Sequence, residues 1–215
     1  MFVFIKYYIV GGVVNILSIR KRQQYLKNLG FYKGMVDGVE GVLTRKAYKS
    51  IQEKYFIRDS DIDGIYGKNT EILLRNAERV RLYTKNFSLK EFKCECNGKY
   101  CSGYPSLISI KLLKYAQVLR KKYGVLYITS GLRCVTFNDS IGGIRGSKHT
   151  LGKAIDFYTS YSASSFSNRK RIINWYANNC VSMFYAYCDG YARYKYRREY
   201  PSVPSMYKSI HVDVK

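Results

Sequence analysis

Residues 147–157 read SKHTLGKAIDF and place a histidine just upstream of an aspartate within an otherwise apolar run. Asp156 stands between two apolar residues, where a carboxylate is costly to bury unless a cation pairs with it. Two imidazoles and one carboxylate form a common catalytic zinc set that leaves one coordination position open for water. The chain has only one histidine besides His149, namely His211 in SIHVDV, residues 209–214. The stretch therefore favours a metal site over an isolated structural histidine.

This stretch fits the pattern Ser-x-His-x-x-Gly-x-Ala-x-Asp with Ser147, His149, Gly152, Ala154 and Asp156. The pattern resembles that of the zinc peptidases that include D-alanyl-D-alanine carboxypeptidases and the L-alanyl-D-glutamate peptidases of phage endolysins. Further matches are Thr129 to Arg133 (TSGLR), Asn138 and the pair Gly142-Gly143. The resemblance covers residues 87–215 and implies Zn2+ held by His149, Asp156 and His211. Gly152 is expected to let the backbone pass close to the metal, and Ala154 to keep the site uncrowded.

The resemblance also implies a catalytic role for Arg133, either on the oxyanion or on a substrate carboxylate or carbonyl. A planar guanidinium beside a metal suits a developing tetrahedral anion. Many members carry Asp or Glu three residues before the last histidine as general base, whereas this chain has Lys208 there. Asp213 is the nearest carboxylate, and it could transfer the proton or orient a ligand; Tyr207 is a weaker alternative. The lysine at position 208 favours the carboxypeptidase-like branch of these zinc peptidases over the L-alanyl-D-glutamate branch.

The remaining pattern of this region predicts supporting elements. Residues 107–123 and 168–179 have helical spacing, and residues 125–129 read as a buried strand that leads to Arg133. The stretch 185–200 is dense in Tyr, Arg and Lys and predicts either a solvated hairpin or a wall-contacting surface. The expected fold is α+β, a zinc peptidase domain with a small antiparallel sheet flanked by helices.

The first third of the chain contains a repeat. Residues 36–44 (VDGVEGVLT) and 62–70 (IDGIYGKNT) both fit apolar-Asp-Gly-apolar-x-Gly-x-x-Thr. Asp and Gly favour tight turns, and Thr44 and Thr70 are expected to cap the helices that follow. A third helical stripe precedes the first copy and ends at Gly30.

Three short helices with two matching turns resemble the peptidoglycan-binding domain found beside many wall hydrolases. The resemblance implies a groove that binds bacterial peptidoglycan, while Asp37 and Asp63 are expected only to cap turns. We predict a peptidoglycan-binding domain at residues 15–78, a short linker at 79–86 and the peptidase domain at 87–215.

The composition predicts the sign of the partner's charge. The chain has 37 Lys and Arg against 15 Asp and Glu, a formal charge of +22, which favours polyanions such as anionic wall polymers. The basic residues are scattered along the chain, so we do not expect nucleic acid as the partner. Residues 1–18 are mostly apolar, but the positive cluster follows the run and no cleavage site is evident. We expect a buried strand or helix there, with no stable membrane insertion, and a monomer.

Six cysteines occur, at positions 94, 96, 101, 134, 180 and 188. Cys94, Cys96 and Cys101 lie close enough to suggest a structural metal clip with a fourth ligand elsewhere, but free buried thiols are an equal alternative.

The predicted function is a peptidoglycan hydrolase of the phage endolysin type, which causes cytolysis. Such a protein stays in the host cytoplasm until it is released to the wall; a bacterial wall-remodelling enzyme would be secreted or wall-bound. The rivals are a wall-binding protein with a decayed peptidase site and a basic nucleic-acid-binding protein.

Overall fold

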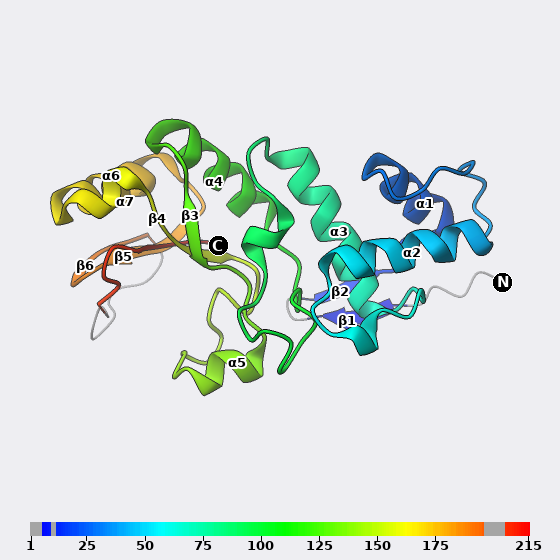
Figure 1. The fold of residues 1–215 in the computed structure, drawn as a ribbon. Helices are drawn as coiled ribbons and strands as arrows, with labels where there is room; N and C mark the ends of the chain where they lie inside the picture. Colours follow the sequence, from blue (N-terminus) through cyan, green and yellow to red (C-terminus); the bar gives the residue numbers. More distant parts are fainter. Residues whose placement is uncertain (1–5, 10–11, 196–204) are drawn as a thin grey trace.

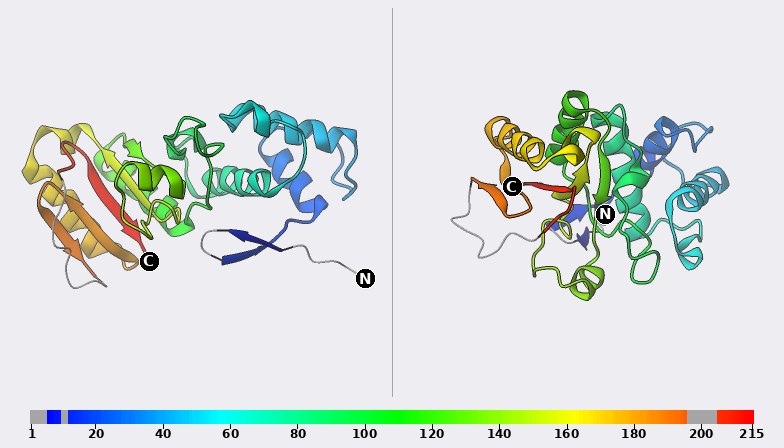
Figure 2. Two further views of the ribbon diagram at one scale, coloured as in Figure 1. Left: turned by 90° about the horizontal axis from the view of Figure 1, so that it is seen from below. Right: turned by 60° about the vertical axis from the view of Figure 1, so that its left-hand side comes forward.

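The structure is a computed structural model that describes residues 6–9, 12–195 and 205–215. The chain forms an elongated molecule with a helical N-terminal part at one end and a sheet-containing part at the other (Figures 1 and 2). The predicted α+β architecture is confirmed: a small three-helix domain precedes a domain with a small antiparallel sheet.

The N-terminal part is built from three helices, as the sequence predicts. They are α1 (Ile19–Asn28), α2 (Val42–Tyr55) and α3 (Lys68–Tyr83), with a 3-10 turn η1 (Asp59–Asp61) between the last two. Before them, β1 (Lys6–Ile9) and β2 (Gly12–Asn15) form an antiparallel hairpin. These strands confirm that part of residues 1–18 is regular structure, whereas the burial expected of this stretch stays a prediction. Residues 1–5 and 10–11 lie outside the described part.

The expected threonine caps are wrong, because helices α2 and α3 begin before Thr44 and Thr70. Their N-cap residues are Gly41 and Gly67, both in extended conformation. The threonine hydroxyls instead face inward, where each accepts a hydrogen bond from a buried glutamine of the preceding helix. The glycines are therefore the N-caps, and the threonines connect the turns to the buried glutamines by hydrogen bonds.

The two matching turns are held by the same network. Gln23 Nε2 donates to Asp37 Oδ1 (2.7 Å) and to the Val39 carbonyl (3.0 Å), and its Oε1 accepts from the Gly38 N–H (2.8 Å). Gln52 makes the same three contacts in the second copy, with Asp63, Ile65 and Gly64. The aspartates therefore organise the turns, in line with the expectation that they act as caps.

The second domain is centred on a five-stranded antiparallel sheet with strand order β3-β4-β7-β5-β6. Its strands are β3 (Tyr127–Ser130), β4 (Ala154–Tyr158), β5 (Met183–Cys188), β6 (Tyr191–Tyr194) and β7 (Ile210–Val214). The last strand thus lies in the middle of the sheet, which brings the end of the chain against β4. The stretch 185–200 contains the β5–β6 hairpin up to residue 195, and residues 196–204 lie outside the described part.

Helices flank this sheet. They are α4 (Ile110–Tyr123), α5 (Val135–Ser140), α6 (Ser160–Ser164) and α7 (Phe166–Asn179), preceded by the 3-10 turn η2 (Leu89–Phe92). Helices α4 and α7 pack against the sheet, whereas α5 lies apart from them, at the bottom of Figure 1. Tyr176 of α7 is fully buried in the core, and α7 matches the helical spacing predicted for residues 168–179.

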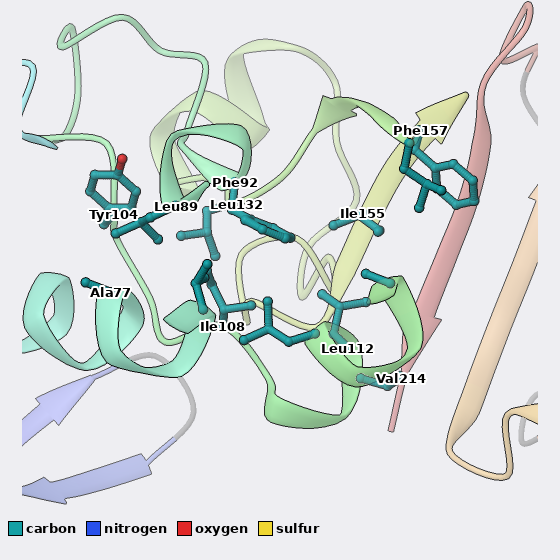
Figure 3. Close-up of a cluster of buried hydrophobic side chains, with 14 of the residues drawn as sticks. Ala77, Leu89, Phe92, Tyr104, Ile108, Leu112, Leu132, Ile155, Phe157 and Val214 are labelled. Atoms are coloured by element: carbon teal, nitrogen blue, oxygen red, sulfur yellow. The ribbon is translucent and has the colours of Figure 1, made fainter. Parts of the chain in front are cut away.

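The two parts share one hydrophobic core. Ala77 of α3 lies in the same buried cluster as Phe92, Leu112 and Ile155 (Figure 3). Helix α3 continues to Tyr83, inside the segment 79–86 that the sequence suggests as linker. The domain limits stay a prediction, but the segment between the parts is largely helical.

Candidate metal centre

Three side chains from two neighbouring strands and one loop meet at the middle of the sheet. Asp156 of β4 lies directly opposite His211 of β7 in the strand register, and His149 comes from the loop before β4. The Asp156 Oδ1 atom is 2.7 Å from His211 Nδ1 and 3.3 Å from His149 Nε2. The two ring nitrogens are 3.3 Å apart. The three residues that the sequence suggests as ligands are thus brought together, all of them buried.

The two distances of 3.3 Å fit a tetrahedral zinc ion, whereas the 2.7 Å contact is that of a direct hydrogen bond. With zinc–nitrogen and zinc–oxygen bonds near 2.0–2.1 Å, the donor atoms of a tetrahedral site are about 3.3 Å apart. His149 Nδ1 lies 2.8 Å from the Gly131 carbonyl, which can only accept a hydrogen bond. His149 Nδ1 therefore carries the proton and Nε2 presents its lone pair to the other two donors. The donor set is suitable for holding a metal ion.

Arg133 fixes the carboxylate of Asp156. Its NH2 group donates to Asp156 Oδ2 at 2.9 Å, and its Nε donates to Ser130 Oγ at 2.8 Å. Ser130 closes β3 opposite Asp156, so the arginine spans two neighbouring strands. One oxygen of Asp156 is thereby held by the guanidinium, while the other faces the two histidines.

Asp213 lies beside the metal group but is held mainly by the backbone. Its Oδ1 accepts from the N–H groups of Phe184 (3.1 Å) and Tyr185 (2.6 Å), at the irregular part of β5. Its Oδ2 is 3.8 Å from His211 Nε2. Tyr207, the weaker alternative, is 85% exposed and does not line the cleft described below.

Burial and mutual contacts shift the pKa values of all three residues. Burial opposes a charged His211, but hydrogen bonds to Asp156 and Asp213 outweigh it and raise the pKa of His211 to about 9. Burial lowers the pKa of His149. Burial would raise the pKa of Asp156, yet both histidines together hold it well below its usual value. The carboxylate is therefore ionised and needs a cationic partner in this position.

A cleft of about 570 Å³ is lined by His149 and His211 of this group. Three cationic residues also line it: Arg133, Arg145 and Lys148. Aromatic residues form a further part of its lining, and the Tyr187 ring stacks on His211 with centroids 4.6 Å apart. Sequence reasoning missed Arg145, Lys148 and Tyr187, because basic residues and tyrosines are so frequent in this chain that none stands out.

Gly152 makes its closest contact with residues far away in the sequence. A Cβ atom at this glycine would lie 2.2 Å from the Leu107 carbonyl oxygen, and its φ is +66°. Gly152 therefore allows close packing of the loop against residues 107–109, and its carbonyl accepts from the Ser109 N–H. Its expected role beside the metal stays a prediction. Gly143 similarly leaves room for the buried Asn138 side chain, which supports the loop along the cleft.

A buried His-Asp-His group that could hold a metal ion thus lies beside a cationic cleft, in a sheet domain joined to a small helical domain. Comparison with known families agrees. Residues 85–185 match the family model of peptidase M15, and residues 18–74 match that of a peptidoglycan binding domain. The chain thus carries a peptidase M15 domain behind a peptidoglycan-binding domain and is a peptidase that acts on the cell wall. No curated protein matches it in sequence.

The peptidase match ends at residue 185, before His211 and Asp213. The strand register of β7 is what connects these two residues to the matched region. Within the described residues, no helix is both long enough and apolar enough to cross a bilayer.

Proposed function

We propose that this protein is a zinc peptidase that hydrolyses an amide bond in the stem peptides or cross-links of bacterial peptidoglycan. The observation that carries the proposal is the convergence of His149 Nε2, His211 Nδ1 and Asp156 Oδ1 within 3.3 Å, beside a cleft that both histidines line. When bound there, zinc supplies a Lewis acid for the scissile carbonyl and makes a water molecule more acidic.

The other residues of the site position and neutralise the substrate. The stem peptides of peptidoglycan end in a carboxylate, and Arg145 and Lys148 supply positive charge along the cleft. Arg133 orients Asp156 and adds positive charge where the tetrahedral anion develops. The contacts of Asp213 support an orienting role, in which its carboxylate favours the proton on His211 Nε2 and leaves Nδ1 for the metal.

We favour a D-alanine-type bond, because position 208 carries lysine where many members of the family have an acidic residue. Digestion of a defined peptidoglycan followed by mass spectrometry of the products tests the proposal. Loss of D-alanine or opening of D-alanine cross-links supports it, whereas new L-alanine carboxyl ends identify the alternative bond. Intact walls with a fully metal-loaded protein would indicate a wall-binding protein with a decayed site. The His149→Ala variant is the inactive control.

The helical domain has a groove of its own. The groove has a volume of about 500 Å³ and lies between α2 and the second matching turn, where Val42 and Ile65 are 71% and 65% exposed. We propose that this apolar groove binds peptidoglycan stem peptides. Val42→Asp with Ile65→Asp is expected to reduce co-sedimentation with purified walls several-fold, while release of product from small soluble muropeptides stays unchanged.

The charge of +22 supports a further contribution from anionic wall polymers. Because exposed charges are screened over about 8 Å at physiological salt, binding to walls that retain teichoic acid should fall as salt rises. Walls stripped of teichoic acid should show a weaker salt dependence. Equal dependence for both preparations would contradict this contribution.

We further propose that the protein is an endolysin-type monomer that waits in the host cytoplasm of a bacteriophage-infected cell and causes cytolysis on release to the wall. A bacterial wall-remodelling enzyme, secreted or wall-bound, is the alternative. Expression in a bacterium with and without a membrane-permeabilising holin distinguishes them, since the endolysin lyses cells only when the membrane is opened.

A further inference from the structure

A second group of potential metal ligands lies outside the proposed active site. It consists of four cysteines, here called the cysteine cluster: Cys94, Cys96, Cys101 and Cys134. Their sulfur atoms all lie within 4.8 Å of one another, although Cys134 is 40 residues from Cys94 in the sequence. From this juxtaposition we propose that the cysteine cluster binds a structural zinc ion. The proposal is independent of the proposed peptidase activity.

The spacing of the sulfur atoms fits such a site. A tetrahedral zinc ion with four bonds to sulfur near 2.3 Å holds its ligands about 3.8 Å apart. The Cys94 and Cys134 sulfurs are 4.0 Å apart, and the Cys96 and Cys101 sulfurs are 3.5 Å apart. Four thiolates at this spacing would repel one another strongly, and a divalent cation removes that repulsion.

The backbone around the cluster is shaped to support thiolates. The N–H of Cys134 points to Cys94 Sγ, and the N–H of Gly103 points to Cys101 Sγ, each at 3.4 Å. Such hydrogen bonds stabilise a negatively charged sulfur. Asn97 and Gly98, with φ of +50° and +82°, form a tight turn that brings Cys96 and Cys101 together.

The cluster fastens a segment that has little regular structure of its own. Residues 93–109 contain no helix or strand, so their position depends on cross-links and packing. The Cys94, Cys96 and Cys134 side chains are buried in a small cluster separate from the main core. The backbone N–H of Cys94 also donates to the Gly103 carbonyl, and this bond closes the loop. Tyr104 and Ile108 anchor the later part of the segment in the main core, and a metal ion would cross-link the earlier part, residues 94–101.

The same segment touches both functional parts of the molecule. Ser102 donates a hydrogen bond to Asp61 of the helical domain. On the other side, Cys134 directly follows Arg133, and the Phe92 carbonyl accepts from the Leu132 N–H at 2.9 Å. A Cβ atom at Gly131 would lie 2.6 Å from that carbonyl, so the two segments are in close contact. The bound ion would therefore hold in place the segment that presents Arg133 and the Gly131 carbonyl to the metal centre.

Counting metal ions in the full chain tests the proposal. Protein produced with zinc and then desalted should contain two zinc ions per chain. Cys96→Ser and His149→Ala should each contain one, and the double variant none. Cys188→Ala is the matched control, because Cys188 is buried outside the cluster and its loss should leave two ions. One zinc in the unaltered protein that Cys96→Ser does not change would overturn the proposal.

Cobalt substitution keeps the test valid if a cysteine variant fails to fold. Of the two ligand groups found among the described residues, the cysteine cluster is the one that contains sulfur. Cobalt in the unaltered chain and in His149→Ala should therefore give a sulfur-to-cobalt charge-transfer band in the near ultraviolet. Absence of that band in both proteins would contradict the proposal. So would disulfides between cluster cysteines, detected by alkylation of the freshly denatured protein and mass spectrometry. In His149→Ala, a chelator should also lower the melting temperature, because the structural ion alone remains.

Discussion

Asp156 divides its two carboxylate oxygens between different partners. One faces His149 and His211, and the other accepts from Arg133. A carboxylate held in this way keeps one oxygen at a fixed angle to the histidines, which a metal site requires. Arg133 is thus both a neighbour of the substrate cleft and the residue that orients a ligand.

Arg133→Lys should therefore reduce activity although the charge is kept. Lysine cannot bond Ser130 and Asp156 through a planar fork, and it presents a smaller donor surface to the developing anion. We expect kcat/KM for wall peptides to fall about 10² to 10³-fold, measured as release of new amino groups. Arg171→Lys, on the exposed side of α7, is the control and should be unaffected. Full activity in Arg133→Lys would contradict the assigned role.

Asp213→Asn separates the two roles that the sequence leaves open. Asparagine can still accept from the N–H groups of Phe184 and Tyr185, but its amide N–H would point at His211 Nε2. This would favour the proton on His211 Nδ1, the atom that faces the metal position. We expect metal affinity to fall about 10 to 100-fold, measured by competition with a chelator. Unchanged affinity with a lost turnover would instead identify Asp213 as the proton-transfer residue.

The motif around His149 predicts that His149 and Asp156 lie close together, because the loop and strand that carry them follow one another directly. It does not predict the close contact of Gly152 with Leu107. That contact joins segments far apart in sequence, so no local pattern encodes it. For the same reason Cys134 does not stand out from the sequence as the fourth member of the cysteine cluster.

In each of the two matching turns, one buried glutamine side chain holds the turn in place through hydrogen bonds. Gln23 is fully buried and supplies donors to Asp37 and Val39 and an acceptor to Gly38. Hydrogen bonds from the Val39 N–H and from Gln23 hold the pKa of Asp37 below its usual value. Asp37 is therefore ionised near neutral pH, and the amide of Gln23 is the donor that faces it.

Gln23→Glu should destabilise the helical domain in spite of its similar shape. A glutamate oxygen would replace the donor that faces ionised Asp37 and the Val39 carbonyl, leaving acceptors opposite acceptors. We expect a loss of about 2 kcal/mol or more in the free energy of unfolding, measured by urea denaturation. Gln24→Glu, the exposed neighbour on α1, is the matched control and should change stability by less than about 0.5 kcal/mol. Equal midpoints for the two variants would rule out the network.

Helical periodicity predicts α1, α2 and α3 because each helix buries one apolar stripe. The position of the N-caps is not predicted, since Gly41 and Gly67 provide no side-chain bond that a pattern could reveal. The central place of β7 in the sheet is also hidden from the sequence, because strand order depends on contacts between distant residues.

The contacts between the two parts predict that the whole molecule unfolds as one unit. Asn76 of α3 is fully buried and donates to the Ser106 carbonyl while accepting from the Ile108 N–H, each at 2.9 Å. Arg79 of the same helix donates to the Ile108 carbonyl. The last helix of the N-terminal part thus fixes the segment that leads into α4, and the two parts cannot separate without breaking buried hydrogen bonds.

Asn76→Ala should consequently destabilise both parts together. The Ser106 carbonyl and the Ile108 N–H would be left buried without partners, at a cost of about 2 to 4 kcal/mol, or a fall of roughly 5 to 15 °C in melting temperature. Trp175, the only tryptophan, reports the peptidase part by fluorescence, while circular dichroism reports helices of both parts. The two signals should change at one temperature in the unaltered protein and at one lower temperature in the variant. The exposed Asn178→Ala serves as control. Separate transitions in the unaltered protein would mean that α3 does not couple the peptidoglycan-binding domain to the peptidase.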